Sequence, residues 1–504
     1  MSGGKGDADN MIPVLFILIP LVSGLTLFFF KNEKSARSWA LFSSVVTLFV
    51  SVSGLTFFND SNHLKFSAEW LSFLGSSFSV KVDGMGQVLC LLTAISYPVI
   101  FLATWKNQYS KASSFFGLMM LEQAGLMGVF VAMDALLFYF FWEMVLIPVY
   151  FLCSRWGGEK RVQATFKFFI YTFLGSVLML VAIIYLFSQT SDHSFSIESF
   201  YRLSKILPAK TQGWVFWLFF AAFAIKMPVF PFHTWQPDLY EQSNTPTTIV
   251  LSGVIVKMGV FACIRWLLPV VSVASFQWGD VVTSLAVTGI LYASLIAIQQ
   301  DDLKRLVAYS SIAHVGLMCA TIFSETTIGF QGVMIQMFNH GINIIGLWIV
   351  VEMIGKQTGT RKISELGGLA QKAPSLAIFA LIIGLANLAL PLTNAFVGEF
   401  MMFNGIFSSG ATRYNVIFTV LAAASIILVS IYILNMIRKV FYGNNNEVTM
   451  AANDIKWNHK LVLSVIVILI IWLGVYPDSI LNLTQGLSET ILKQSDVMHL
   501  FSGK

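Results

Sequence analysis

The sequence predicts an all-α integral membrane protein with about fourteen transmembrane helices. Two observations carry this prediction: 56% of the 504 residues are apolar and only 11% are charged, and long uncharged runs recur along the whole chain. One soluble core of this length could not bury so much apolar surface, so we expect the lipid bilayer to be the solvent. Each crossing needs roughly 20 apolar residues, and the runs therefore set the helix count.

The apolar runs justify the helices in chain order. They lie near 12–30, 39–57, 86–104, 115–132, 135–153, 166–188, 214–231, 247–268, 281–299, 306–323, 329–354, 374–409, 415–437 and 461–476. The stretch from Phe115 to Cys153 is too long for one crossing, so a tight hairpin is expected at its clearest polar break, Met133-Asp134. The polar start, with Asp7 and Asp9, is unlike the basic start of a cleavable signal, so the first run is expected to stay as a helix.

Two of the runs carry proline breaks and predict an internal repeat. Pro228 and Pro231 interrupt the seventh run, and Pro391 interrupts the twelfth. Helices five crossings apart run in opposite directions, which is typical of inverted repeats with an ion path at the breaks. The N-terminal section, residues 1–114, is predicted to hold helices 1–3. The first repeat is 115–268 with helices 4–8, and the second is 281–437 with helices 9–13. Residues 438–504 form a C-terminal loop, helix 14 and a tail.

The basic residues predict the orientation. With the N-terminus outside, Lys and Arg favour the cytoplasmic connections by roughly two to one, as the positive-inside rule requires. Both termini are therefore expected on the non-cytoplasmic side. The run Asp301-Asp302-Leu303-Lys304-Arg305 is interpreted as a solvated turn and topology anchor, and Arg265 as a second anchor.

Charged residues inside the runs each cost roughly 3 kcal/mol on insertion scales, and four of them stand out. They are Glu143, Lys226, Lys257 and Glu399. Glu143 and Lys226 could form a structural ion pair between two helices, but buried pairs are weak evidence of stabilisation. The alternative is a proton site, because forming or breaking such a pair changes its affinity for protons. Lys257 has no acid nearby on its own helix and is interpreted as a relay residue rather than a packing or snorkelling lysine.

Four further residues are candidates for the same proton relay. His314 and His340 titrate near neutral pH in their unperturbed form and would continue a polar track from Lys257 toward Glu399, although a lone buried histidine is often only a core residue. Glu122 and Lys167 are weaker candidates: Glu122 could face a neighbouring subunit, and Lys167 could snorkel.

Redox chemistry and metal binding are not expected of this chain alone. No glycine-rich dinucleotide fingerprint, phosphate loop, or Cys or His cluster is present, and the four cysteines, at 90, 153, 263 and 319, have no ligand spacing and are interpreted as packing residues. No nucleic-acid partner is expected. The energy for transport would come from an ion gradient or from partner subunits.

Four long motifs resemble the antiporter-like subunits of respiratory complex I, over roughly residues 80–480. They are Phe141-Trp142-Glu143-Met144, Lys226-Met227-Pro228-Val229-Phe230-Pro231-Phe232-His233-Thr234-Trp235, Asp302-Leu303-Lys304-Arg305-Leu306-Val307-Ala308-Tyr309-Ser310-Ser311, and Phe396-Val397-Gly398-Glu399-Phe400. A glutamate rather than a lysine on the broken twelfth helix resembles the subunit M branch (chain 4 in mitochondrial naming). One departure is Thr245-Pro246-Thr247, where the family has Ala-Pro-Thr, together with an added acid at Glu241.

The resemblance implies roles and partners. Glu143 and Lys226 would be the coupled pair, Lys257 the central relay lysine, and Glu399 the terminal proton-exchange site. FMN, iron–sulfur clusters and quinone would reside in partner subunits, with neighbouring antiporter-like subunits beside this one in a bacterial inner (plasma) membrane. Related interpretations are the D-type membrane component of a multisubunit Na⁺/H⁺ antiporter and a membrane subunit of an energy-converting hydrogenase. A structural membrane spacer is the alternative from another class.

Overall fold

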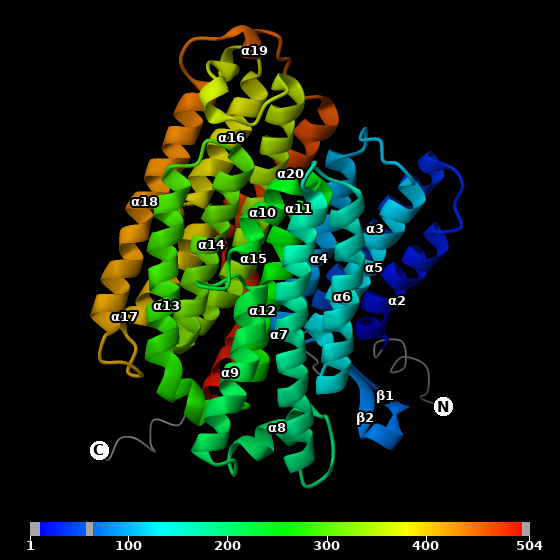
Figure 1. The fold of residues 1–504 in the computed structure, drawn as a ribbon, viewed down its shortest axis with the longest axis vertical. Helices are drawn as coiled ribbons and strands as arrows, with labels where there is room; N and C mark the ends of the chain where they lie inside the picture. Colours follow the sequence, from blue (N-terminus) through cyan, green and yellow to red (C-terminus); the bar gives the residue numbers. More distant parts are fainter. Residues whose placement is uncertain (1–10, 57–63, 496–504) are drawn as a thin grey trace. The chain divides into compact units, whose positions relative to one another are not determined.

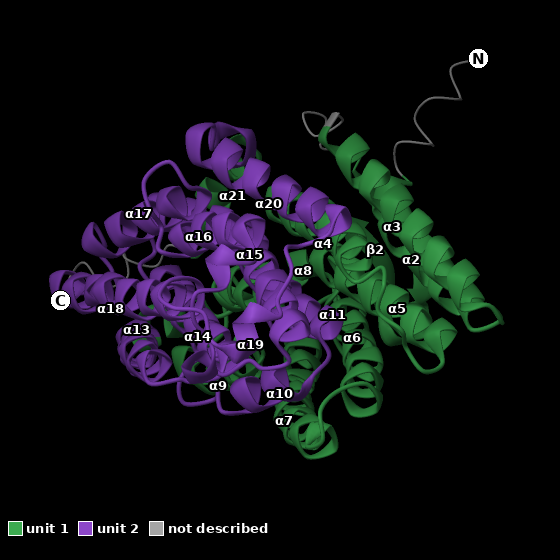
Figure 2. Ribbon diagram, turned by 90° about the horizontal axis from the view of Figure 1, so that it is seen from above, with its two compact units in different colours: residues 1–227, 257–278, 482–504 green, residues 228–256, 279–481 purple. Residues whose placement is uncertain are grey.

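The computed structural model describes residues 11–56 and 64–495, and helices dominate this part of the chain (Figure 1). Eleven of the described helices are long and apolar enough to cross a membrane. The chain divides into two compact units (Figure 2). Unit 1 comprises Met1–Met227, Lys257–Trp278 and Asn482–Lys504, and unit 2 comprises Pro228–Val256 and Gly279–Leu481.

Most helices of unit 1 begin and end close to the predicted runs. They are α2 (Ile12–Leu27), α3 (Glu33–Thr56), α4 (Gly84–Ala103), α5 (Ala112–Val131), α6 (Ala135–Arg155), α7 (Arg161–Gln189), α8 (Ile197–Ser204), α9 (Ala209–Lys226), α12 (Val256–Ala262), the π-helix η3 (Cys263–Leu267) and most of α21 (Asp478–Ser495). The hairpin between α5 and α6 is confirmed at residues 132–134. Asp134 fixes this turn, since its carboxylate accepts hydrogen bonds from the N–H groups of Leu136 and Leu137.

Unit 2 holds the remaining helices. They are α10 (Trp235–Gln242), α11 (Thr245–Val250), the π-helix η2 (Leu251–Ile255), most of α13 (Ser272–Ile298), α14 (Leu303–Ile322), α15 (Thr327–Thr358), the 3₁₀ turns η4 (Ile363–Glu365) and η5 (Leu369–Gln371), α16 (Pro374–Asn387), α17 (Asn394–Phe407), α18 (Asn415–Phe441), α19 (Glu447–Met450) and α20 (Trp457–Val475). Both predicted breaks are present: helix α9 ends at Lys226 inside the seventh run, with α10 beginning beyond that run, and the twelfth run splits into α16 and α17.

A β-hairpin departs from the all-α prediction. Strands β1 (Lys65–Leu71) and β2 (Ser76–Lys81) pair antiparallel around the 3₁₀ turn η1 (Ser72–Leu74) and Gly75, whose φ of 76° suits a residue without a Cβ. A search for uncharged runs misses strands this short and polar. The same search missed α8 and α21, whose apolar residues occupy only one face.

Connections between helices are joined by hydrogen bonds within each unit. In unit 1, the N–H of Met133 donates to the carbonyl of Ser79 at 2.9 Å, and that of Ala135 to Phe195 at 2.8 Å. In unit 2, the N–H of Gly368 donates to the carbonyl of Tyr442 at 3.0 Å. In each case the joined connections are an even number of predicted crossings apart, which is the pattern of helices that alternate in direction.

Asp454 fastens one of these connections to the start of α16. Its carboxylate accepts hydrogen bonds from the N–H groups of Ser375 and Leu376, each at 3.3 Å, and from the Lys460 amine at 3.2 Å. Partial burial works against the charge, but the hydrogen bonds outweigh it and hold the pKa of Asp454 below its usual value. The ionised carboxylate therefore caps α16 from outside the helix.

Candidate functional site

Lys226 is the last residue of α9 and is 2% exposed. Pro228 follows two residues later and cannot donate to the helix, so α9 ends where this amine is buried. The Lys226 Nζ atom lies 5.4 Å from the ring centroid of Trp142 and 5.9 Å from that of Phe168. Aromatic faces attract a cation within about 6 Å, so they stabilise the charge in a site closed to bulk water.

Two carboxylates interact electrostatically with Lys226: Glu143 on α6, which is half-buried, and Glu122 on α5, which is fully buried. Both oxygens of Glu122 and the Oε1 atom of Glu143 are buried without a hydrogen-bond partner among the described residues. Tyr97 lies close to Glu122. Buried polar atoms of this kind usually bind ordered water. The structure thus brings the predicted Glu143 and Lys226 together and adds Glu122 as a second carboxylate.

Lys257 is fully buried on α12, between the π-helices η2 and η3. Such π-turns occur often at functional positions. Gly259, two residues further, packs directly against the end of α9: a Cβ there would lie 2.6 Å from the Phe223 carbonyl oxygen and 2.8 Å from the Met227 nitrogen. Only glycine permits this approach, so Gly259 sets how close the helix of Lys257 comes to the break after Lys226.

Arg265 is not the exposed anchor that the sequence predicted. It is 4% exposed and ion-paired with Asp83, the N-cap of α4. The carbonyl of Arg265 also accepts a hydrogen bond from the Tyr201 hydroxyl at 2.9 Å. Lys167, the weaker candidate on α7, is half-buried near the start of that helix.

The break between α16 and α17 is held by amide side chains of α15. Asn339 donates to the carbonyl of Asn394 at 2.7 Å, and Asn343 donates to that of Ala386 at 3.3 Å. Ala389 and Leu392, inside the break, have φ values of 53° and 72°, a conformation that L-residues rarely adopt. A broken helix at membrane depth persists only when protein groups satisfy the freed backbone, and these asparagines do so.

Glu399 on α17 contacts His314 on α14. The His314 Nδ1 atom lies 3.1 Å from Glu399 Oε1, and Gln336 donates to the same oxygen at 3.4 Å. Glu399 and His314 are each 7% exposed. The rings of His314 and His340 are 5.4 Å apart between centroids. The structure therefore unites the three titratable residues predicted for this region.

A small cavity adjoins Glu399 and His314, with room for about one water molecule. Asn387 and Ser425 add polar groups to its lining. The Asn387 side chain also donates to Ser310 Oγ at 3.0 Å. A hydrogen-bonded carboxylate and imidazole beside a water-sized space can pass a proton to and from water.

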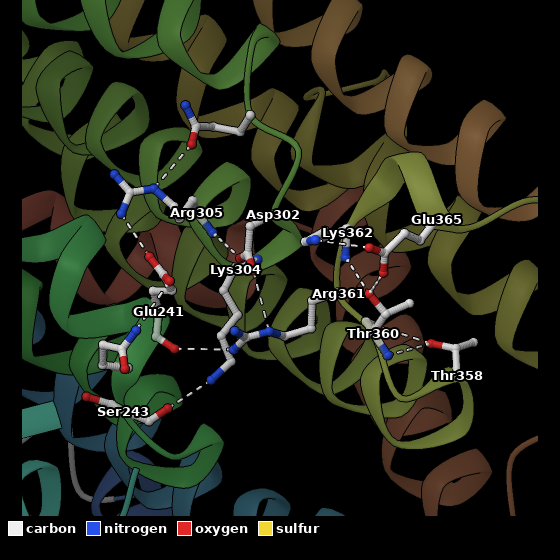
Figure 3. Close-up of polar contacts among 12 residues, drawn as sticks. Glu241, Ser243, Asp302, Lys304, Arg305, Thr358, Thr360, Arg361, Lys362 and Glu365 are labelled. Atoms are coloured by element: carbon white, nitrogen blue, oxygen red, sulfur yellow. Dashed lines mark hydrogen bonds and ion pairs between the residues drawn. The ribbon is translucent and has the colours of Figure 1, made fainter. Parts of the chain in front are cut away.

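Lys304 and Arg305 do not form a solvated turn, which corrects the sequence interpretation. Lys304 is 7% exposed, and its amine donates to the carbonyl of Ser243 at 2.8 Å. Arg305 binds Glu241 at 2.9 Å (Figure 3), and it also binds Asp238 at 3.2 Å. Glu241, the added acid, thus helps to hold α10 against the start of α14.

Sequence reasoning missed the amides Gln336, Asn339, Asn343 and Asn387. Asn339 and Asn343 lie four residues apart within an apolar run, and this spacing places two polar groups on one helix face. That spacing was the available signal. No group of three His, Cys, Asp or Glu side chains that could hold a metal ion occurs within residues 11–56 and 64–495, and the four cysteines there are free and buried.

Comparisons with known proteins cover nearly the whole chain. A family model described as NADH:quinone oxidoreductase/Mrp antiporter, TM matches residues 132–427. The chain is 36% identical over 493 residues to NADH-quinone oxidoreductase subunit M of Rickettsia prowazekii, covering 95% of this chain and 99% of that protein. It is 34% identical over 494 residues to F(420)H(2) dehydrogenase subunit M of Methanosarcina mazei, covering 96% and 98%.

Solved structures agree with these relatives. A chain of respiratory complex I from Thermus thermophilus with bound NADH matches with a TM-score of 0.88 at 28% identity, over 96% of this chain and 100% of that one. A chain of the Mrp complex from Dietzia sp. DQ12-45-1b matches with a TM-score of 0.84 at 16% identity, over 96% and 98%, and this is a likeness of fold alone.

Proposed function

Because the chain belongs to the NADH:quinone oxidoreductase/Mrp antiporter family of membrane subunits, we propose that it is the proton-translocating membrane subunit of a NADH:quinone oxidoreductase, of the subunit M type. The family and the subunit M resemblance expected from the sequence motifs are confirmed. The relatives cover 95% of the chain, so the proposal concerns the whole protein rather than one part of it.

One observation of the structure carries the proton-translocating role: in each unit a buried titratable group lies at or near a break in a helix. Lys226 ends α9 in unit 1, and Glu399 follows the break before α17 in unit 2, where it binds His314. Buried charges inside a membrane are costly and mark ion paths. A structural spacer would have no use for such groups.

The relay we propose uses the residues expected from the sequence. Glu143 and Lys226 load and release a proton as a coupled pair, and Lys257 passes it on. His340, His314 and Glu399 complete the path, with Glu399 as the exchange site beside the water-sized cavity. Glu122 interacts with Lys226 and would share its charge. Lys167 remains the weakest candidate, because it is only half-buried.

The alternating connections support the finer topology. We propose fourteen crossings, made of the eleven long apolar helices together with α2, α9 and the α16–α17 pair. Helices 4–8 (115–268) and 9–13 (281–437) would form the inverted repeats, between the N-terminal section 1–114 and the C-terminal section 438–504. Both termini would lie on the non-cytoplasmic side of a bacterial inner membrane, since the positive-inside rule favours that orientation.

Partner subunits would supply the electron transfer. FMN, iron–sulfur clusters and quinone are placed there, and neighbouring antiporter-like subunits would flank this chain in the membrane arm. The relatives named for NADH and for F(420)H(2) are of similar identity, so the electron donor belongs to the partners rather than to this chain. The Na⁺/H⁺ antiporter and hydrogenase alternatives are less favoured, because the Mrp complex shares only the fold at 16% identity.

The test measures electron transfer and proton uptake together in membrane vesicles that contain the complete complex. Glu143→Gln and Lys226→Ala should abolish most proton uptake and the coupled NADH oxidation, while oxidation with an artificial electron acceptor shows that the complex is assembled. Matched controls are Glu159→Gln and Lys210→Ala, which change exposed residues of unit 1. These two variants should keep both rates.

Two outcomes contradict the proposal. If Glu143→Gln and Lys226→Ala complexes assemble and pump at the wild-type rate, the charged pair is structural and the relay is wrong. If the chain's removal leaves NADH oxidation and coupled pumping intact, it is not a subunit of this enzyme.

A further inference from the structure

Lys304 on α14 is a buried lysine that the relay described above does not use. Its amine donates to the Ser243 carbonyl at 2.8 Å, and the side chain is 7% exposed. The charged groups that face it are Glu352 on α15, Glu241 at the end of α10, Asp302 at the start of α14 and Arg361 after α15. A cluster of this kind calls for an explanation beyond topology.

Glu352 links Lys304 to solvent. Its carboxylate accepts a hydrogen bond from the Thr245 hydroxyl and forms an ion pair with Lys356 at 3.0 Å. The exposed fraction of the side chain falls from 42% at Lys356 to 19% at Glu352, and Lys304 is the most buried of the three. The three residues therefore lie in a series from the surface toward the interior of unit 2.

The two helices that carry Lys304 and Glu352 also carry the histidines near Glu399. Lys304 and His314 are both on α14, ten residues or roughly 15 Å apart along the helix. Glu352 and His340 are both on α15. Two rigid helices thus join the surface series to the buried Glu399–His314 contact within unit 2.

Buried polar atoms without a protein partner lie between the two ends. Ser311, two turns after Lys304 on the same face of α14, has a buried hydroxyl with no partner among the described residues. The Nε1 atom of Trp348, one turn before Glu352, is also buried without a partner among the described residues, and so is the Nε2 atom of His314. Such atoms are normally satisfied by ordered water. Tyr309, Ile312 and Ala313 belong to an apolar cluster with Ala293 of α13.

We propose that Glu352, which faces the buried Lys304, is the proton-uptake site of unit 2, and that water along α14 carries the proton from it to His314 and Glu399. This inference rests on the proposed function and on the topology that places the connections around Lys304 on the cytoplasmic side. Hydronium protonates the Glu352 carboxylate and leaves water. The neutral acid then gives the same proton to water beside Ser311 and becomes a carboxylate again, while Lys304 keeps its charge and favours the return.

The experiment compares Glu352→Gln with Glu365→Gln in vesicles that hold the complete complex. Glu365 lies on the same connected surface and is paired with Lys362, but it is exposed, so it controls for loss of a carboxylate there. We expect Glu352→Gln to lower the coupled proton-uptake rate about tenfold or more, as removal of a proton-transfer group does. The loss of rate in Glu352→Gln should become larger as pH rises, because proton uptake from solvent then limits the coupled rate. Glu352→Asp should restore part of the rate.

A purely structural role gives a different result. Glu352→Gln would then reduce the rate equally at every pH, or reduce only the amount of assembled complex, and either outcome overturns the inference. The same holds if Glu352→Gln pumps as Glu365→Gln does. If Glu352→Gln pumps as Glu365→Gln does, the Glu143→Gln complex decides what remains. A Glu143→Gln complex that does not pump leaves the proposed function standing, whereas one that pumps contradicts both the proposed function and this inference.

Discussion

Gly259→Ala tests whether the distance between α12 and the end of α9 matters for the relay. The added Cβ would lie 2.6 Å from the Phe223 carbonyl oxygen and 2.8 Å from the Met227 nitrogen. These are backbone atoms, roughly 0.8 Å inside ordinary contact distance, so no side chain can rotate away. The helices must separate, at a cost of about 1–3 kcal/mol, which is typical of overpacking.

The separation of α9 and α12 would occur beside the two lysines of the relay, whose positions must be accurate for proton transfer. Lys257 is two residues from Gly259, and Lys226 is next to Met227. A displacement of about 1 Å in a positioned reacting group can cost on the order of a hundredfold in rate. We therefore expect Gly259→Ala to assemble, to lose a large part of its coupled proton-uptake rate, and to denature at lower temperature than wild type.

Gly213→Ala on α9 is the matched control. A Cβ at Gly213 would meet only Trp278 Nε1, at 3.8 Å, which is an ordinary contact. Because alanine is the better helix former, this variant should be neutral or more stable by up to about 1 kcal/mol. Proton uptake by vesicles and thermal denaturation of the purified complex report both effects. Equal behaviour of the two variants would refute the argument from close packing.

Two further predictions concern unit 2. Asn339→Ala removes the donor to the Asn394 carbonyl at the break, so it should lower the thermal stability of the complex by about 1–3 kcal/mol. The control Asn404→Ala changes an exposed residue and should leave the stability unchanged. Equal stabilities of the two variants would contradict the role of the Asn339 amide. The pKa of Asp454 is depressed in the folded protein, so its stabilisation of α16 is present above its ordinary value of 3.8 and is lost as pH falls through the lowered pKa. Asp454→Asn should cost about 1 kcal/mol of stability at neutral pH and remove this acid dependence, which hydrogen exchange at the start of α16 measures. The control Glu447→Gln should leave the acid dependence unchanged. If the dependence persists in Asp454→Asn, another group causes it.

The helices and the candidate charges could be predicted because a bilayer constrains the sequence strongly. Uncharged runs located the helices, and the breaks at Pro228 and Pro391 could be seen because proline cannot continue a helix. Charges at Lys226 and Glu399 stood out against apolar surroundings. The roles assigned to these residues stay predictions.

Other features depend on tertiary contacts that a sequence pattern does not contain. Lys304 and Arg265 lie near helix ends, where most basic residues are exposed anchors, and only the Ser243 carbonyl and the Asp83 carboxylate explain their burial. The hydrogen bond between His314 and Glu399 joins residues 85 positions apart. The β-hairpin was missed because its strands are shorter and more polar than a membrane run.

The touching connections have a mechanical consequence for each unit. Hydrogen bonds such as those from Met133 and Gly368 fasten helix ends to one another within each unit, so neighbouring helices resist sliding past one another. The irregular segments lie between those ends instead: residues 227–234 and 388–393, and the π-turns on either side of Lys257. Regular helical hydrogen bonding is therefore interrupted away from the joined ends, beside Lys226, Lys257 and Glu399.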